Sequence, residues 1–366
     1  MERYLGLMSG TSADGVDAVI AVFDSGRFLH LEASHHRAHP PALRQTLVAL
    51  GRDAHASITL AALASLDVEI ADQFAAAALA VLQAAGLKAS DIRAIGSHGQ
   101  TIFHDPKQTR SSLQWGDPNR IAAITGIPVA ADFRRMDIAL GGEGAPLVPA
   151  FHQAVFGSSV ATAVINIGGI ANITQLSGNS NQPTLGYDCG PGNALMDEWA
   201  LRHLNTPYDA GGRLAAQGSV VDELLAAWLA DAYFHLAPPK STGRSLFNLD
   251  WAAALAPQGL DHYAVADVQA TLCELTARAA SAAVAADTAR VLICGGGAFN
   301  THLMQRLAAL LPEASLASTE SDGLPPQWVE ASAFAWLAHQ RVHHLPGNLP
   351  SVTGASRPAV LGGLYG

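Results

Sequence analysis

The residues best suited to chemistry stand near the start of the chain, in a polar turn between two apolar runs. Hydroxyl and glycine residues at 9–12 are followed by the carboxylates of Asp14 and Asp17, and a second apolar run covers 18–23. The pattern predicts a β-hairpin whose tip is larger than the two residues that a simple reversal needs. Glycine backbone and hydroxyls donate to phosphate oxygens, and carboxylates hold a hard cation, so the tip predicts a site for phosphate and magnesium.

Two further turns rich in glycine repeat this arrangement downstream. The first lies between two predicted strands within 163–176, and the second joins a buried strand at 291–294 to a predicted helix. One polar turn alone is weak evidence because such turns are common. Three of them favour a nucleotide site, with the phosphates at the hairpins and the nucleoside end at the third turn. The turns contain Asn166, Gly168 and Gly169, and Gly295, Gly296 and Gly297.

Asp188 is the carboxylate with the most pointed sequence context. We expect it at the end of a strand, followed by Gly-Pro-Gly and a helix over 193–203. A turn of this kind projects a carboxylate outward beside the positive end of a helix dipole, so Asp188 can act as a general base or hold magnesium. An aspartate that only caps the helix is the competing interpretation.

A second polar cluster is expected in the first half of the chain. His98, Gln100 and Thr101 follow one predicted strand as a loop, and Arg134 and Arg135 follow another. Ligands bind at the carboxyl ends of strands in open α/β sheets, so these side chains should face a binding cleft. Paired arginines can grip a carboxylate or a phosphate through forked hydrogen bonds. A capping histidine and a solvated arginine pair are the alternatives.

Length and periodicity predict an α/β fold with two domains and a cleft. The 366 residues exceed the roughly 250–300 at which single cores stop growing. Three extended runs precede helical segments such as 59–85, which is not the plain alternation of a Rossmann unit. Glycine and proline are dense at 140–150, which indicates a crossing between the halves and a hinge. We predict domains over 1–135 and 136–347, with 348–366 returning to the first.

Composition restricts the classes of partner. The net charge of −10 argues against nucleic acid or an anionic membrane as the main partner. The three cysteines form no CxxC pair, so neither a zinc site nor a disulfide framework is expected. We also expect no secretory leader, and no apolar stretch of the ~18–20 residues that a membrane span needs. These features together predict a cytoplasmic protein.

The ordered set of motifs resembles the anhydro-N-acetylmuramic acid kinase family, from the first predicted strand to the last helix. The main departures from the family pattern are conservative, such as Ala13 in the opening turn, and Ile170 and Ala171 in the second hairpin. The motifs are MSGTSADGVD from Met8, GSHGQT from Gly96, ADFRR from Ala131, INIGGIAN from Ile165, DCGPGN from Asp188, KSTGR from Lys240, CGGGAFN from Cys294, and Glu330.

The resemblance implies a fold of the sugar kinase and actin (ribonuclease H-like) type, with ATP and Mg²⁺ between two related domains, and a homodimer. It implies that Asp188 deprotonates the water that opens the anhydro sugar. It also implies that Glu330, with Arg134 or Arg135 and the His98 loop, holds the sugar. Gln100, Thr101 and Asn166 are further predicted sugar-binding residues. The implied ATP-binding residues are Gly10, Thr11, Ser12, Ala13, Asp14, Gly15, Val16 and Asp17, with the glycines at 168–169 and 295–297. Asp14 and Asp188 are the predicted metal ligands.

Two other classes of protein are alternatives to this kinase. An actin-like nucleotide switch would have similar hairpins but would not need Asp188, paired arginines and a polar His98 loop at one cleft. A silent sugar-binding regulator would be expected to lack the acidic base. A kinase of another amino sugar is the alternative within the enzyme class, and the requirement for the anhydro bond distinguishes it.

Overall fold

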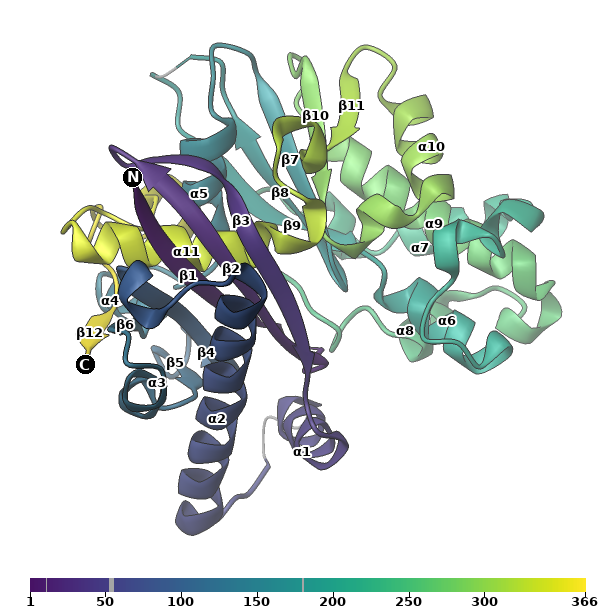
Figure 1. The fold of residues 1–366 in the computed structure, drawn as a ribbon. Coiled ribbons are helices and arrows are strands. Elements are labelled where there is room, and N and C mark those ends of the chain that lie inside the picture. The colour runs from purple at the N-terminus through teal and green to yellow at the C-terminus, as the bar shows by residue number, and fades with distance from the viewer. Residues whose placement is uncertain (11, 53–55, 180) are drawn as a thin grey trace. The chain divides into compact units, whose positions relative to one another are not determined.

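The computed structural model describes residues 1–10, 12–52, 56–179 and 181–366 (Figure 1). The chain divides into two compact units, which we call unit 1 (Met1–Val155 with Trp328–Gly366) and unit 2 (Phe156–Gln327). These bounds differ from the predicted domains. The segment 140–150 belongs to unit 1, and the chain returns to unit 1 about twenty residues earlier than expected, because helix α11 (Val329–Val342) packs on the sheet of unit 1.

Unit 1 is built on a mixed sheet that begins with an antiparallel meander. Strands β1 (Glu2–Ser9), β2 (Gly15–Asp24) and β3 (Arg27–Ala38) pair in sequence, each antiparallel to the next. On the other side of β1 lie β4 (Ala94–Asp105) and β6 (Val129–Ala131), both parallel to it. Strand β12 (Gly363–Tyr365) closes this edge next to β6, and β5 (Ser111–Trp115) pairs with the second half of β4.

Unit 2 repeats the plan. Strands β7 (Thr162–Ile167), β8 (Ile170–Leu176) and β9 (Leu185–Pro191) form an antiparallel meander. Strands β10 (Arg290–Cys294) and β11 (Ser315–Ser318) continue the sheet in parallel on the other side of β7. Two sheets with one strand order confirm the prediction of two related α/β domains.

Helices α2 (Leu60–Ala85) and α11 cover opposite faces of the sheet of unit 1. Leu5 and Leu7 share a core cluster with residues of α2, whereas the alternate residues Tyr4 and Gly6 meet α11. A Cβ atom on Gly6 would overlap the carbonyl of Ala331, so glycine lets α11 lie directly on β1. This close packing fixes the helix that carries Glu330.

Helix α2 corrects one prediction. Among the described residues it is the one helix long and apolar enough, by length and composition, to cross a membrane, whereas the sequence predicted no such stretch. Thr59 caps its start and Gly86, with φ 66°, ends it. Its buried face, which includes Leu66, Ile70 and Phe74, packs in the core of unit 1, so α2 is a core helix.

The remaining elements surround these sheets. In unit 1 they are α1 (Pro41–Arg52), α3 (Pro118–Thr125), α4 (Phe133–Ala139), α5 (Val148–Phe156), which crosses the boundary, and α12 (Pro350–Thr353), with η1 (Ala89–Asp91). In unit 2 they are α6 (Ala194–Leu204), α7 (Asp222–Leu229), α8 (Leu249–Leu255), α9 (Val265–Ala282) and α10 (Thr301–Leu310). The short 3₁₀ helices are η2 (Ala210–Gly212), η3 (Ala215–Gln217), η4 (Ala232–His235), η5 (Leu260–His262), η6 (Gly296–Phe299), η7 (Thr319–Asp322) and, at the boundary, η8 (Pro326–Trp328).

Two of three local predictions differ from the structure. The segment around His98 is not a loop but part of β4, because β5 pairs with the second half of this strand after the break at Gly99, where φ is 73°. Arg134 and Arg135 follow strand β6, as predicted, and lie in the first turn of α4. Asp188 stands in the middle of β9, since Cys189, Gly190 and Pro191 continue the strand.

Candidate functional site

The tip of the first hairpin is a compact turn with its polar groups outside. The N–H of Ala13 donates to the carbonyl of Gly10 over 3.1 Å, and the hydroxyl of Ser12 donates to Asp14 Oδ1 over 2.8 Å. Ser12 and Asp14 are exposed, whereas Gly15 and Val16 are buried at the start of β2. The hairpin is confirmed, and a phosphate role for its tip stays a prediction. Thr11 lies outside the described residues.

Buried side chains hold this tip from below. Ser9 Oγ donates to Gln100 Oε1 over 2.6 Å, and Gln100 Nε2 donates to the carbonyl of Gly10 over 3.1 Å. His39 Nε2 lies 3.3 Å from the same serine hydroxyl. Both ends of the Gln100 amide therefore contact the hairpin, which makes Gln100 a support of the tip. Thr101 accepts a hydrogen bond from Gln114 Nε2 over 3.3 Å.

Arg134 and His98 form the centre of the polar cluster in unit 1. Arg134 Nε and Nη2 lie 3.2 and 2.8 Å from His98 Nε2, and Nη1 donates to the carbonyl of Gly144 over 2.8 Å. His98 Nδ1 lies 3.3 Å from the carbonyl of Ser9, so Nδ1 carries the proton and Nε2 accepts from Arg134. Burial, followed by the charge of Arg134, holds the pKa of His98 well below its usual range, which keeps the ring neutral.

Glu330 and Asp17 belong to the same electrostatic cluster. Burial raises the pKa of Glu330, the negative charge of Asp17 raises it further, and Arg134 opposes both. Burial likewise raises the pKa of Asp17, against its hydrogen bond of 2.7 Å with His36 Nδ1. Burial lowers the pKa of Arg134 to about 10, with Glu330 acting in the opposite direction. The structure thus brings together four charged or polar residues, whereas the resemblance implied the ATP site for one of them and the sugar site for the other three. The first is Asp17, and the others are His98, Arg134 and Glu330.

Arg135 has different surroundings from Arg134. It is exposed and forms a two-pronged ion pair with Asp132, at 2.7 Å from Nε and 2.6 Å from Nη2. With His98 and Asp132 it lines a small cavity of about 80 Å³. The two adjacent arginines therefore have different partners, Arg134 in the buried polar cluster and Arg135 at the surface, although the sequence analysis considered them as a pair.

In unit 2, backbone groups fix Asp188 on β9. Its Oδ2 accepts from the N–H of Thr242 over 2.9 Å, and its own N–H donates to the carbonyl of Lys240 over 3.1 Å. The hydroxyl of Tyr233 donates to the carbonyl of Asp188 over 2.8 Å. Lys240 Nζ lies 4.8 Å from the centre of the Tyr233 ring. The segment 240–242 is therefore hydrogen-bonded to the residue that the sequence proposed as a base, with Thr242 bonded to its carboxylate.

The glycine turns of unit 2 pack against one another. The carbonyls of Gly168 and Gly169 accept from the N–H groups of Gly192, Asn193 and Ala194, at 2.8–3.2 Å, so this turn anchors the start of α6. Gly295 has φ 76° and ψ −177°, a conformation that only glycine adopts easily. A Cβ atom on Gly295 would also overlap Asn166 Oδ1. Gly296 and Gly297 follow as the start of η6, with Gly297 buried against Ile167.

Arg244 and Asp197 form a charged pair near the turn at Gly168 and Gly169, and the sequence analysis did not predict this pair. A Cβ atom built on Gly169 would lie 3.4 Å from Arg244 Nε, so the guanidinium lies over the glycine turn. Asp197, in the first turn of α6, is electrostatically coupled to Arg244, and burial raises its pKa to about 6. An aspartate in a first helical turn normally just complements the dipole, so the sequence carried no signal for this site.

Comparison with known proteins shows which family the chain belongs to. The model of the family described as anhydro-N-acetylmuramic acid kinase matches residues 2–366. The chain belongs to this family. It is 50% identical over 366 residues to the anhydro-N-acetylmuramic acid kinase of Shewanella pealeana, with 99% of this chain and 98% of that one covered. It is 49% identical over 374 residues to the enzyme of that name from Pseudomonas paraeruginosa, with 100% and 99% covered.

Membership of the anhydro-N-acetylmuramic acid kinase family makes the chain an ATP-dependent phosphotransferase. Among solved structures it is similar to component A of the Acidaminococcus fermentans (R)-2-hydroxyglutaryl-CoA dehydratase. That likeness has a TM-score of 0.47 at 13% identity and covers 94% of this chain and 100% of the other.

Proposed function

We propose that the chain opens 1,6-anhydro-N-acetylmuramic acid with water and transfers the γ-phosphate of ATP to the freed 6-oxygen. The products are N-acetylmuramic acid 6-phosphate and ADP, and the setting is peptidoglycan recycling. The observation that carries the proposal is the match of residues 2–366 to the family of this name. The polar clusters of the two units supply groups suited to each part of the reaction.

Asp188 is the proposed general base. Attack of water on the anomeric carbon needs a group that takes a proton from the water as the bond between C1 and the bridging oxygen breaks. The contact from the Thr242 N–H to Oδ2 fixes the orientation of the carboxylate, which supports this role. The bridging oxygen then attacks the γ-phosphorus, and the bond to the β-γ bridging oxygen of ATP breaks.

The cluster of Glu330, Arg134 and His98 is the proposed sugar site. The hydrogen bonds of Arg134 to His98 and Gly144 use three of the five N–H groups of its guanidinium. A guanidinium held in this way suits the carboxylate of the lactyl group, which a plain hexose lacks. Burial, which raises the pKa of Glu330, also strengthens any hydrogen bond that Glu330 makes to the sugar.

The tip at 10–17 is proposed to hold the ATP phosphates with Mg²⁺. Magnesium in phosphoryl-transfer sites keeps several waters and takes one or two carboxylates besides the phosphate oxygens. The exposed carboxylate of Asp14 at the tip fits this donor set. The ion would neutralise charge on the β- and γ-phosphates during transfer.

A coupled assay of ADP release tests the proposal. It compares anhydro-N-acetylmuramic acid, N-acetylmuramic acid and no sugar, with ATP and Mg²⁺ present. Release that depends on the anhydro sugar is the expected result. Equal rates with N-acetylmuramic acid would show a kinase that activates a sugar hydroxyl, and release without any sugar would show a nucleotide switch.

We further propose a cytoplasmic homodimer. The three cysteines are buried thiols in the structure, which fits a reducing compartment. The dimer rests on the family resemblance, and light scattering of the purified chain would distinguish a 76 kDa species, about twice the 38.0 kDa chain, from a monomer.

A further inference from the structure

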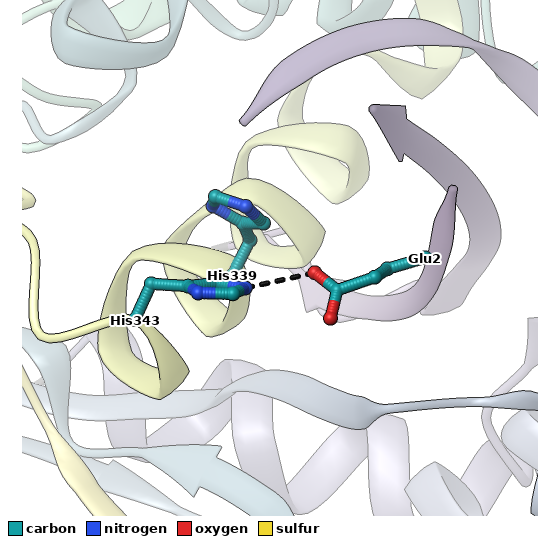
Figure 2. Close-up of side chains that lie close together, drawn as sticks. All are labelled: Glu2, His339 and His343. Carbon is teal, nitrogen blue, oxygen red and sulfur yellow. Dashed lines mark hydrogen bonds and ion pairs between the residues drawn. The ribbon is translucent and has the colours of Figure 1, made fainter. Parts of the chain in front are cut away.

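Unit 1 contains a cluster of metal-ligating side chains apart from the polar cluster around Arg134. Glu2 begins β1, His339 lies in the last turn of α11, and His343 follows the end of that helix. One ligand atom from each side chain lies within 4.8 Å of the others. Figure 2 shows the two imidazoles on neighbouring turns and the Glu2 carboxylate facing them from the strand.

The spacing of the two histidines suits a shared ion. Residues four apart on a helix lie on one face, one above the other, so His339 and His343 present their rings side by side. Their ring centroids are 4.4 Å apart. Two imidazoles and one carboxylate are a donor set that Zn²⁺ takes in proteins, with water in the fourth position.

The carboxylate of Glu2 is oriented toward the histidines. Its Oε2 lies 2.8 Å from His343 Nε2 and accepts from the hydroxyl of Tyr4 over 3.2 Å, whereas the other oxygen, Oε1, lies 4.0 Å from Arg93 Nε. The competing cation thus contacts the oxygen that faces away from the rings. An ion at Oε2 would leave the contact with Arg93 in place.

The cluster combines one rigid ligand with two adjustable ones. His339 is only 3% exposed, lies stacked on Phe23 at 5.2 Å, and has Nδ1 3.1 Å from Gln340 Oε1. Contacts of this kind fix the ring orientation of metal-binding histidines. The side chains of His343 and Glu2 are 40% and 38% exposed. Ligands of a tetrahedral zinc ion lie about 3.3 Å apart. The ligand atoms of His343 and Glu2 are already 2.8 Å from each other, so the pair must open slightly and approach His339 by roughly 1.5 Å at most.

We propose that Glu2, His339 and His343 bind one Zn²⁺ ion, which joins the first strand of unit 1 to the end of α11. Glu330 lies near the other end of this helix, about 14 Å from His339 and about 20 Å from His343 along the axis at 1.5 Å per residue. The ion is therefore a structural link and takes no part in phosphate transfer. Its effect is on thermal stability, because a metal that binds only the folded chain stabilises it.

The test measures zinc binding directly on the full chain. Tag-free protein is stripped with EDTA, dialysed against buffered Zn²⁺ without ATP or Mg²⁺, and analysed for metal content and thermal unfolding. We expect one Zn²⁺ per chain and a rise of Tm by several degrees. His343→Ala and Glu2→Gln should bind at least ~10-fold more weakly, since loss of even an outer-shell partner costs 10–100-fold. Both residues are half exposed, so the variants should fold, and the Tm of the stripped proteins checks this.

His30→Ala is the matched control, because His30 is an exposed histidine on β3 of the same unit. This variant should bind zinc as the parent does. The proposal is overturned if the parent chain retains no zinc, or if His343→Ala and Glu2→Gln retain it as well as His30→Ala does. In the first case the cluster is an ion pair between Glu2 and His343, and in the second the zinc binds elsewhere.

Discussion

The first hairpins of the two units occupy the same place in the same strand order and yet present different groups. In unit 1, Ser12 and Asp14 stand exposed at the tip, and Gln100 supports the turn from below. In unit 2, the carbonyls of Gly168 and Gly169 accept from the N–H groups of residues 192–194, which lead into α6. The first tip therefore offers side chains to a ligand, whereas much of the second is occupied in holding a helix.

The carboxylates also stand at different positions in the two meanders. Close to the tip, unit 1 pairs Met8 with Asp17, and unit 2 pairs Asn166 with Asn172. The carboxylate proposed as the base of unit 2, Asp188, stands instead on the third strand of the meander. A repeated architecture thus does not require repeated chemistry, and each unit can carry a separate part of the reaction.

The largest effect is expected from Asp188→Asn in unit 2. The amide keeps the shape of the side chain and can still accept from the Thr242 N–H, but it cannot take a proton from water. Loss of a general base lowers kcat by about 10²–10⁴-fold. Steady-state ADP release measures the loss, and calorimetry should find ATP affinity within about threefold of the parent.

Asp250→Asn is the control for that experiment, because Asp250 is an exposed carboxylate on α8 of the same unit. It should leave kcat unchanged. If Asp188→Asn turns over at the parental rate, Asp188 is not the base. The base would then have to come from unit 1, from the cluster that contains Asp17 and Glu330.

The second prediction compares one glycine from each unit. Gly295→Ala should lower the free energy of unfolding by at least about 1–3 kcal/mol, because alanine is strained at φ 76° and its Cβ overlaps Asn166 Oδ1. A Cβ on Gly10 meets Ser12 Oγ at 3.8 Å, which is ordinary contact, so Gly10→Ala should change stability by less than about 0.5 kcal/mol. Urea unfolding measures both.

Kinetics of the same pair then separates packing from binding. If Gly10→Ala is as stable as the parent but raises KM for ATP, the first tip contacts the nucleotide, as proposed. An unchanged KM would remove Gly10 from the phosphate site. Equal destabilisation by both substitutions would contradict the contrast between the open tip at Gly10 and the closely packed turn at Gly295.

The part of this organisation that the sequence could predict is the part encoded locally. Alternating apolar runs, the cap at Gly86 and the turn at Gly168 and Gly169 fix strands, helix ends and hairpins over a few residues. The sequence also singled out His98, Arg134 and Glu330. Only the family resemblance, and no local pattern, predicted that Glu330 lies near the other two.

Longer-range choices were not visible in the sequence. Whether 97–101 is a loop or a strand depends on β5, which pairs with β4 from ten or more residues away. Arg134, rather than the adjacent Arg135, turns inward because it contacts His98 and Gly144, which lie elsewhere in the chain. The coupling of Asp197 to Arg244 depends on how the segment 240–244 folds back over Gly169. Tertiary contacts decide each of these.

A smaller effect is expected from Asp197→Asn, and it depends on pH. Burial raises the pKa of Asp197 from 3.8 to about 6, so between these values the folded chain binds more protons than the unfolded chain. Stability therefore falls as pH rises through this window. The variant lacks this penalty and should be more stable than the parent by about 1 kcal/mol above pH 6, after allowance for solvent screening. The difference should vanish toward pH 4.

Urea midpoints of parent and variant, measured from pH 4 to pH 8, test the sign of that difference. A variant that is less stable by a constant amount at every pH would contradict it. Such a result would mean that the attraction between Asp197 and Arg244 outweighs the burial of the carboxylate. Unit 2 would then hold its arginine by an ion pair, as unit 1 does at Arg135 and Asp132.

The smallest effect is expected from Arg135→Ala in unit 1. Its ion pair with Asp132 is exposed, and such pairs contribute about 0.2–1 kcal/mol, so stability should change by no more than that. KM for the anhydro sugar should stay within about twofold, because the neighbouring Arg134 makes the contacts to His98 and Gly144 that hold a guanidinium in the proposed sugar site. A tenfold rise in KM would instead show that Arg135 leaves Asp132 to bind the substrate carboxylate. In that event the inner arginine would be the structural member of the pair, and the recognition group of unit 1 would lie at its surface, as the side chains of its hairpin tip do.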